Sequence, residues 1–213
     1  MLPKINQVYR QAISNAQRFD GIAPLLLRLY LAPIFIQAGW TKAISFDSTV
    51  RWFGSVEYGL GMPFPELMAS MAIGAEFFGG WLLLFGLFTR LTAIPLMITM
   101  LVAAVTAHWK NGWLALADSH SWFADGTILY SESIMAAAEK KQKAIEILQE
   151  HGHYEWLTSS GPFTILNNGI EFAATYFIML FVLFFIGGGR YTSVDFFIRR
   201  YLDKKLNGQS KGH

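Results

Sequence analysis

Four long apolar stretches dominate the pattern of hydrophobic and polar positions along the chain. Each approaches the ~20 residues with which a helix crosses a bilayer. They cover residues 21–44, 64–88, 91–108 and 163–188. Only Thr89-Arg90 separates the second stretch from the third, which predicts an antiparallel helical hairpin. We therefore predict an all-α fold, a four-helix transmembrane bundle in a single membrane domain of residues 1–213.

The segments outside the four stretches carry patterns of their own. Residues 1–20 place apolar side chains at helical spacing with basic residues elsewhere on the wheel, which favours a retained interfacial helix over a soluble amphipathic one. The loop 109–162 holds an amphipathic helical pattern over residues 132–150. Because aromatic residues are concentrated at both ends of this loop, we expect the loop to fold back as a cap over the bundle. Residues 189–213 form a basic tail.

The distribution of Lys and Arg predicts the orientation in the membrane. Ten of these residues lie on the side that holds both termini and the Thr89-Arg90 turn, and five lie on the other side. Cytoplasmic segments carry the excess of positive charge. We therefore predict a multi-pass protein with both termini in the cytoplasm and the acidic loop 109–162 in the periplasm.

The composition narrows the function classes. The chain is 53% hydrophobic and 15% charged, against ~45–50% and ~25% in soluble domains, which favours a protein in contact with the lipid bilayer. A net charge of +2 lacks the basic excess of a nucleic-acid-binding protein. The absence of cysteine excludes thiol, disulfide and thiolate-metal chemistry. Any redox role must then belong to a bound cofactor or to a partner.

Ionisable residues lie inside the apolar stretches, where each costs at least ~2.5–3.5 kcal/mol at the centre of a span. Arg28, Glu76 and Glu171 are placed deep, and Lys42 and His108 close the outer ends of their spans. One interpretation is internal ion pairs, Arg28 with Glu76 and either Lys42 or His108 with Glu171. The other is a polar cavity where a carboxylate and an imidazole handle protons beside a bound redox or lipid-like molecule.

Soft donor atoms raise the question of a copper site. Met97 and Met100 share the third span with His108, and His151 and His153 lie in the outer loop. Methionines at helical spacing are more often packing residues, so we predict no metal site. His151 and His153 are the least implausible ligands if one exists.

Short motifs in the spans, taken together, resemble the DoxX family of small bacterial inner-membrane proteins. They are Arg28 with Gly39 and Lys42; Glu76-x-x-Gly79-Gly80; Gly86-x-x-Thr89-Arg90; Asn168-x-x-Glu171; Gly187-x-Gly189; and Ser193-x-Asp195. The outer loop, with Trp122-Phe123-Ala124-Asp125-Gly126 and Trp156-Leu157-Thr158, looks like the subgroup that accompanies copper-responsive, bufferin-type peptide gene clusters.

The resemblance implies a four-helix bundle of the bacterial inner membrane, related to quinone-linked oxidoreductase subunits such as the membrane part of thiosulfate:quinone oxidoreductase. A quinone is then the expected cofactor, with electrons passing to or from an external protein. Proton transfer would fall to Glu76, His108 and Glu171. Binding of the quinone, including polarisation of a carbonyl, would fall to Arg28, Lys42 and Arg90.

Two function hypotheses from different classes follow. The first is a quinone-linked oxidoreductase subunit in a redox or metal-stress pathway. The second is a non-catalytic membrane anchor or a small-solute or copper-handling partner protein, which presents loop 109–162 to a periplasmic protein or peptide. The sequence leaves open whether the protein forms a homo-oligomer.

Overall fold

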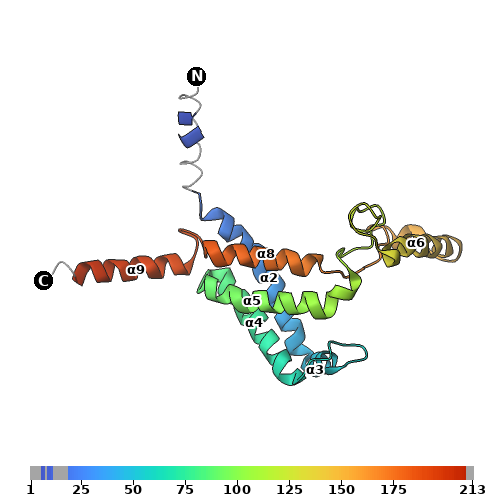
Figure 1. Ribbon diagram of the computed structural model, residues 1–213, viewed down its shortest axis with the longest axis horizontal. Helices are drawn as coiled ribbons and strands as arrows, with labels where there is room; N and C mark the ends of the chain where they lie inside the picture. The colour runs from blue at the N-terminus through green and yellow to red at the C-terminus, as the bar shows by residue number, and fades with distance from the viewer. Residues whose placement is uncertain (1–5, 8, 12–18, 210–213) are drawn as a thin grey trace. The chain divides into compact units, whose positions relative to one another are not determined.

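Helices form the regular structure of the protein, which is a computed structural model that describes residues 6–7, 9–11 and 19–209 (Figure 1). The predicted all-α class is confirmed. The helices are α2 (Ile22–Ile44), α3 (Phe46–Gly54), α4 (Pro65–Phe85), α5 (Thr89–Val102), the π-helix η1 (Ala103–His108), the 3-10 helix η2 (Trp109–Asn111), α6 (Glu132–His151), α7 (Tyr154–Leu157), α8 (Glu171–Ile186) and α9 (Val194–Gln209). Most of the predicted interfacial helix 1–20 lies outside the described residues.

The chain divides into two compact units. The first consists of Met1–Met100 together with Tyr176–His213, and the second is Leu101–Thr175. The assignment of residues 1–213 to one membrane domain stays a prediction, as does the expectation that loop 109–162 caps the bundle.

Three helical segments are long and apolar enough to cross a membrane. They are α2, α4 and the continuous helix Thr89–Asn111, which joins α5 to η1 and η2. Their bounds follow the predicted stretches closely, except that α4 ends at Phe85 rather than at residue 88. The cause is Gly86, whose φ of 65° ends the helix in the left-handed conformation that favours glycine.

The fourth apolar stretch, residues 163–188, is helical only from Glu171, which corrects the predicted start of that span. The residues before Glu171 are hydrogen-bonded to the backbone of residues 112–117; the N–H of Asn167, for example, donates to the Ala115 carbonyl at 3.0 Å. The 16 residues of α8 rise about 24 Å. That length falls short of the ~30 Å hydrocarbon core.

A single buried cluster in the first unit joins four helices. Its side chains come from α2, α4, α5 and α8 and are fully or almost fully buried: Leu31, Ala32, Phe35, Leu83, Ala93, Leu96, Leu180 and Leu183. Large apolar side chains on the other faces of the same helices are exposed, among them Leu26, Phe78, Ile98 and Phe181. An apolar core inside an apolar surface is the arrangement expected of helices surrounded by lipid.

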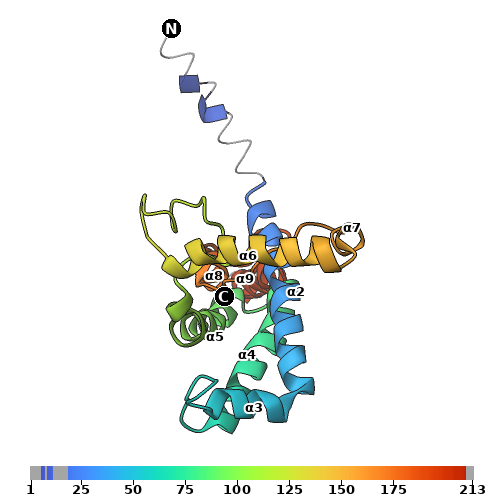
Figure 2. The same ribbon diagram turned by 90° about the vertical axis from the view of Figure 1, so that its right-hand side faces the viewer.

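The helices α2 and α4 pack closely because glycine lies at their contact. A side-chain carbon on Gly39 of α2 would lie 2.5 Å from the backbone nitrogen of Phe77, and one on Gly80 of α4 would lie 2.7 Å from Ile36 Cγ1. Small residues at such positions let two membrane helices approach. Figures 1 and 2 show α2 and α4 side by side, connected at one end by α3, a helix that the sequence analysis did not predict. This contact fixes which residues of the two helices face each other.

The second unit is organised around α6. Its bounds, Glu132–His151, match the amphipathic pattern predicted over residues 132–150. Ile134 of α6 packs against Leu114 and Ala124 in a small buried cluster. The apolar positions of this helix therefore serve the core of the second unit.

Candidate functional site

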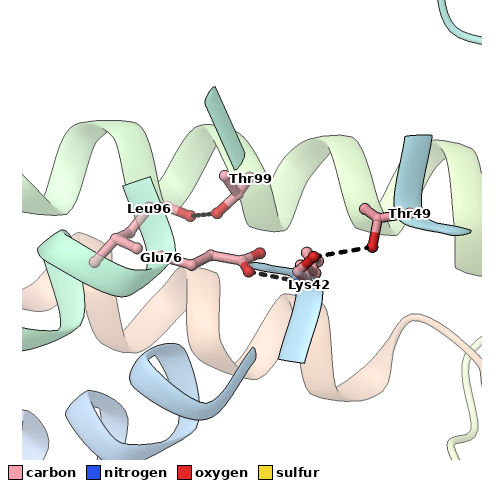
Figure 3. Close-up of polar contacts among 5 residues, drawn as sticks. All are labelled: Lys42, Thr49, Glu76, Leu96 and Thr99. Atoms are coloured by element: carbon pink, nitrogen blue, oxygen red, sulfur yellow. Dashed lines mark hydrogen bonds and ion pairs between the residues drawn. The ribbon is translucent and has the colours of Figure 1, made fainter. Parts of the chain in front are cut away.

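A charged pair joins α2 to α4. Lys42 lies near the end of α2, one helical turn beyond Gly39, and Glu76 lies at the middle of α4. The ammonium of Lys42 donates to Glu76 Oε2 at 2.5 Å (Figure 3). The ion-pair interpretation of the sequence joined Glu76 to Arg28, and either Lys42 or His108 to Glu171; the structure instead pairs Glu76 with Lys42, so the pairing with Arg28 is wrong. The reason is the helix register, because Gly39 faces Phe77 and the next turn of α2 then faces Glu76.

The two members of the pair differ in their access to the surroundings. The side chain of Glu76 is 6% exposed and that of Lys42 is 27% exposed. The hydroxyl of Thr99 donates to the Leu96 carbonyl of its own helix (Figure 3). Among the ion pairs of the described residues, this is the one that joins two helices long and apolar enough to cross a membrane. Glu76 thus depends on Lys42 for its counter-charge.

Aromatic residues lie close to the pair in the sequence. The rings of Trp40 and Phe77, which neighbour the pair on α2 and α4, lie 6.0 Å apart between centroids. The attraction between two opposite charges is stronger in a low-dielectric setting than in water, and a single buried charge without a partner is costly there. A carboxylate held by one ammonium within apolar helices can hold or release a proton next to a flat apolar molecule.

Arg28 is fully buried in α2 and binds backbone carbonyls. Its Nη1 donates to the carbonyls of Leu83 and Leu84 at 3.3 and 3.1 Å, and its Nη2 donates to the Thr192 carbonyl at 2.7 Å. The first two carbonyls close the last turn of α4, where a cation is stabilised by the helix dipole. Arg28 therefore ties the end of α4 to the segment before α9, and its predicted role in quinone binding stays a prediction.

Asp195 caps the start of α5. Its carboxylate accepts hydrogen bonds from the backbone N–H groups of Phe88 and Thr89 at 2.7 and 2.9 Å. Its own N–H donates to the Gly86 carbonyl at 3.0 Å. A carboxylate on the first N–H groups of a helix satisfies donors that have no partner within that helix. The motifs Gly86-x-x-Thr89-Arg90 and Ser193-x-Asp195 are thus hydrogen-bonded to each other at the start of α5.

Replacing Asp195 with Ala should destabilise the protein by about 1–2 kcal/mol, the typical cost of losing a helix cap. The N–H groups of Phe88 and Thr89 would lose their acceptor. Thermal unfolding in detergent measures the effect. Asp203→Ala, on the exposed surface of α9, is the matched control, and an equal loss in both variants would contradict the capping role.

His108 ends the π-helix η1 and lies in the second unit. Its Nδ1 lies 2.9 Å from the Asn168 carbonyl oxygen. Because a carbonyl only accepts hydrogen bonds, Nδ1 carries the hydrogen, and in the neutral ring Nε2 has a free lone pair. Short π-helices are frequent at functional sites. His108 is therefore held in the tautomer that a proton acceptor requires.

Glu171 lies at the first residue of α8 rather than deep in a span, which corrects its predicted depth. Its Oε2 accepts the Ala115 N–H at 2.8 Å. The neighbouring Asn167 donates Nδ2 to the carbonyls of Asn111 and Leu114 at 2.7 and 2.6 Å. Asn167 is not among the site residues predicted from the sequence. The signal that could have found it is the polar run of residues 167–169 directly before Glu171.

The aromatic motif of the outer loop builds a tight turn at the start of α6. Asp125 accepts the Thr127 N–H at 2.7 Å, and this hydrogen bond lowers the pKa of the Asp125 carboxyl. Ala124 is fully buried, and the rings of Trp113 and Phe123 stack with centroids 5.8 Å apart. These residues therefore hold the fold of the second unit together.

The predicted weak metal ligands lie at the end of α6. His151 Nε2 is 3.8 Å from the Glu150 carboxylate, and both side chains are largely exposed. His153 borders a shallow hollow of about 410 Å³. Within the described residues, no group of three or more His, Cys, Asp or Glu side chains is placed to hold a metal ion.

The comparison with known families covers the part of the chain that holds the Lys42–Glu76 pair. The family model described as DoxX matches residues 23–109. This range includes Arg28, Arg90 and His108 and stops before Glu171.

Three relatives match part of the chain. "Putative oxidoreductase CatD" of Bacillus subtilis (strain 168) is 33% identical over 97 residues, 46% of this chain and 68% of the relative. "Inner membrane protein YphA" of Escherichia coli (strain K12) is 36% identical over 93 residues, 42% of this chain and 64% of the relative. "Inner membrane protein YqjF" of the same organism is 32% identical over 78 residues, 37% of this chain and 55% of the relative. The chain thus spans about two thirds or less of these relatives' lengths, and no solved structure matches it significantly.

Proposed function

The chain belongs to the DoxX family of membrane proteins, and on that premise we propose that it is a quinone-linked oxidoreductase subunit of the bacterial inner membrane. The single observation that carries the proposal is the ion pair between Lys42 and Glu76 inside apolar helices. An ionisable residue within a membrane is expensive, and it is a functional-site hypothesis by default. One relative is named an oxidoreductase and two are named inner membrane proteins, which agrees with this assignment.

The residues around the pair fit a quinone. A quinone is a flat, largely apolar ring with two carbonyls, and it supplies the redox chemistry because it takes up two electrons and two protons on reduction to the quinol. The rings of Trp40 and Phe77 offer an aromatic surface. Lys42 offers a hydrogen-bond donor to a carbonyl oxygen, and Glu76 offers a group that exchanges a proton.

The roles within the pair follow from its exposure. Glu76 holds or releases the proton, because its carboxylate is the more buried member. Lys42 balances the charge of Glu76. Because Lys42 is the more exposed of the two, it connects the buried carboxylate with the surroundings at the end of α2. The chain has no cysteine, so the electrons pass to or from an external redox protein. His108 would act in a second proton exchange through its free Nε2.

The proposal includes a topology. The helices α2, α4 and Thr89–Asn111 cross the membrane, and α8 completes a fourth crossing where the bilayer thins locally around its 16 residues. Both termini then lie in the cytoplasm with the larger share of Lys and Arg.

A second candidate function is favoured by one observation, since residues 101–175 form a compact unit of their own. Such a unit could bind a periplasmic protein or peptide while the apolar helices serve as an anchor. Placement in the copper-responsive subgroup belongs to this alternative. Deletion of residues 132–150 should then abolish co-purification of the partner, whereas the quinone content of the protein should be unchanged.

Mass spectrometry of lipid extracts from the detergent-purified protein tests the quinone proposal directly. We expect about one quinone per chain, lost on replacement of Lys42 by Met but retained in Glu66→Gln. Glu66 lies in the first turn of α4 and is exposed, so it controls for the general effect of altering this helix. A wild-type protein free of quinone, which also fails to take up a short-chain quinone added to it, would refute the proposal.

A further inference from the structure

A pocket of about 550 Å³ lies where the N-terminal ends of α2 and α5 meet the C-terminal end of α8 and the start of α9. It is distinct from the Lys42–Glu76 pair, and all its lining residues belong to the first unit. The glycine run 187–189 forms part of its wall, and Gly187 and Gly189 have φ values of 77° and 93°. Since only glycine adopts such angles readily, the backbone turns sharply here and leaves room between the helix ends.

Three arginines line this pocket: Arg90, Arg190 and Arg199. Arg190 is 3.5 Å from Asp20 and so has a counter-charge. Arg90 donates one hydrogen bond, from Nη2 to the Phe185 carbonyl at 2.9 Å. Within the described part of the chain Arg199 makes no hydrogen bond or ion pair.

The acidic side chains of the pocket are already engaged, Asp20 with Arg190 and Asp195 with two backbone N–H groups. Asp195 keeps its negative charge, so three arginines against two aspartates leave the pocket with a net positive charge of one. Among the described ion pairs, Arg90 and Arg199 are the lining arginines without a carboxylate partner. Guanidinium groups bind phosphate through paired N–H donors, which gives both geometric fit and strength. The chemistry of the pocket is that of a phosphate site.

The rest of the wall shows what the phosphate would be attached to. Leu91 and Ile186 line the pocket and are 65% and 47% exposed, as is expected of side chains on the lipid-facing surface at the ends of α5 and α8. A phosphate seated between Arg90 and Arg199 would have this apolar surface beside it. The acyl chains of a phospholipid could pack on this apolar surface along the helices, whereas a free phosphate would gain no contact energy from the surface.

The helix α9 marks the level of the membrane surface beside the pocket. Its apolar side chains recur at helical spacing and are exposed: Val194, Phe197, Ile198, Tyr201 and Leu202. Arg199, Arg200, Asp203 and Lys204 occupy the rest of its circumference. An exposed apolar stripe with basic flanks is typical of a helix that lies in the interface of an anionic membrane.

We propose that this pocket binds the phosphate of an anionic phospholipid, held by Arg90 and Arg199, with α9 lying on the same membrane surface. The proposal is independent of the quinone chemistry, because it uses neither Lys42 nor Glu76.

Native mass spectrometry of the detergent-purified full chain tests this. The probes are phosphatidylglycerol, phosphatidylcholine and inorganic phosphate. We expect one phosphatidylglycerol per chain, bound about tenfold more tightly than phosphatidylcholine, because the choline ammonium brings a positive charge beside the two arginines. Arg199→Gln should remove most of this preference, and adding Arg90→Gln should remove the remainder. Because Arg199 has no partner among the described residues, its replacement should leave the fold intact.

The matched control is Arg200→Gln, which removes the same charge from α9 at a position that does not line the pocket. It should keep the preference for phosphatidylglycerol within about twofold. An equal loss in the Arg200 and Arg199 variants would overturn the proposal in favour of general surface charge. Displacement of phosphatidylglycerol by millimolar inorganic phosphate would overturn the lipid assignment and make the site one for free phosphate.

Discussion

Replacing Glu76 with Gln should reduce quinone-linked turnover by about 10²–10⁴-fold, the usual contribution of a positioned proton donor or acceptor. The amide keeps an oxygen that can accept the hydrogen bond from Lys42, and it has nearly the volume of the carboxyl group. What it lacks is the exchangeable proton and the negative charge. The effect should therefore fall on the reaction rather than on the fold.

The rate to measure is the oxidation of a short-chain quinol by the purified protein, with a soluble dye as electron acceptor, above the rate without protein. Glu66→Gln is the control for altering a carboxyl group on the same helix, and its rate should equal that of the wild type. The apparent melting temperature in detergent separates lost chemistry from lost structure. Retention of more than half the wild-type rate in Glu76→Gln would exclude Glu76 from the proton transfer.

A reciprocal change at Lys42 distinguishes a catalytic pair from a purely structural one. In Lys42→Met the carboxylate loses its counter-charge and hydrogen-bond donor, and a lone buried carboxyl group favours its neutral form. We expect the quinol oxidation rate to fall and its dependence on pH to shift upward. A structural pair would lower the melting temperature without moving the pH profile.

The helical architecture could be predicted from the sequence because hydropathy alone decides which segments enter a bilayer. The first three apolar stretches are helices as predicted. The start of α8 could not be predicted from hydropathy. Residues 163–166 are largely apolar, yet the hydrogen bonds of Asn167 and its neighbours tie the backbone of residues 165–170 to residues 112–117. Composition does not encode which backbone groups find partners in a distant segment.

The candidate site could be predicted only as a set of residue types. Burial of Arg28 and Glu76 follows from their place in apolar stretches, but the partner of Glu76 depends on the register of α2 against α4. That register is set by Gly39 and Gly80, whose missing side chains decide how the helices slide. Arg28 binds only backbone carbonyls, and a carbonyl belongs to every residue. No pattern of side chains could have indicated those partners.

Replacing Arg28 with Met should destabilise the protein by about 2–4 kcal/mol, because buried carbonyls lose their donor and each such loss costs about 1–3 kcal/mol. The Leu83 carbonyl keeps a second partner, the Gly86 N–H, whereas those of Leu84 and Thr192 have none other among the described hydrogen bonds. Removing a buried cation returns part of the cost of its desolvation. The expected loss is therefore smaller than three hydrogen bonds alone would indicate.

Thermal unfolding in detergent measures this loss, which corresponds to a fall of roughly 5–15 °C in melting temperature for a chain of this size. Arg51→Met, at an exposed position of α3, controls for removing one arginine and should leave the melting temperature unchanged. Arg28→Lys retains the charge but not the planar fork that reaches two segments at once, so its melting temperature should fall between those of Met and wild type. An Arg28→Met protein as stable as the wild type would refute the role of Arg28 in tying α4 to the segment before α9. A guanidinium buried without structural gain would then have to be explained by a bound ligand, as the sequence analysis first proposed for this residue.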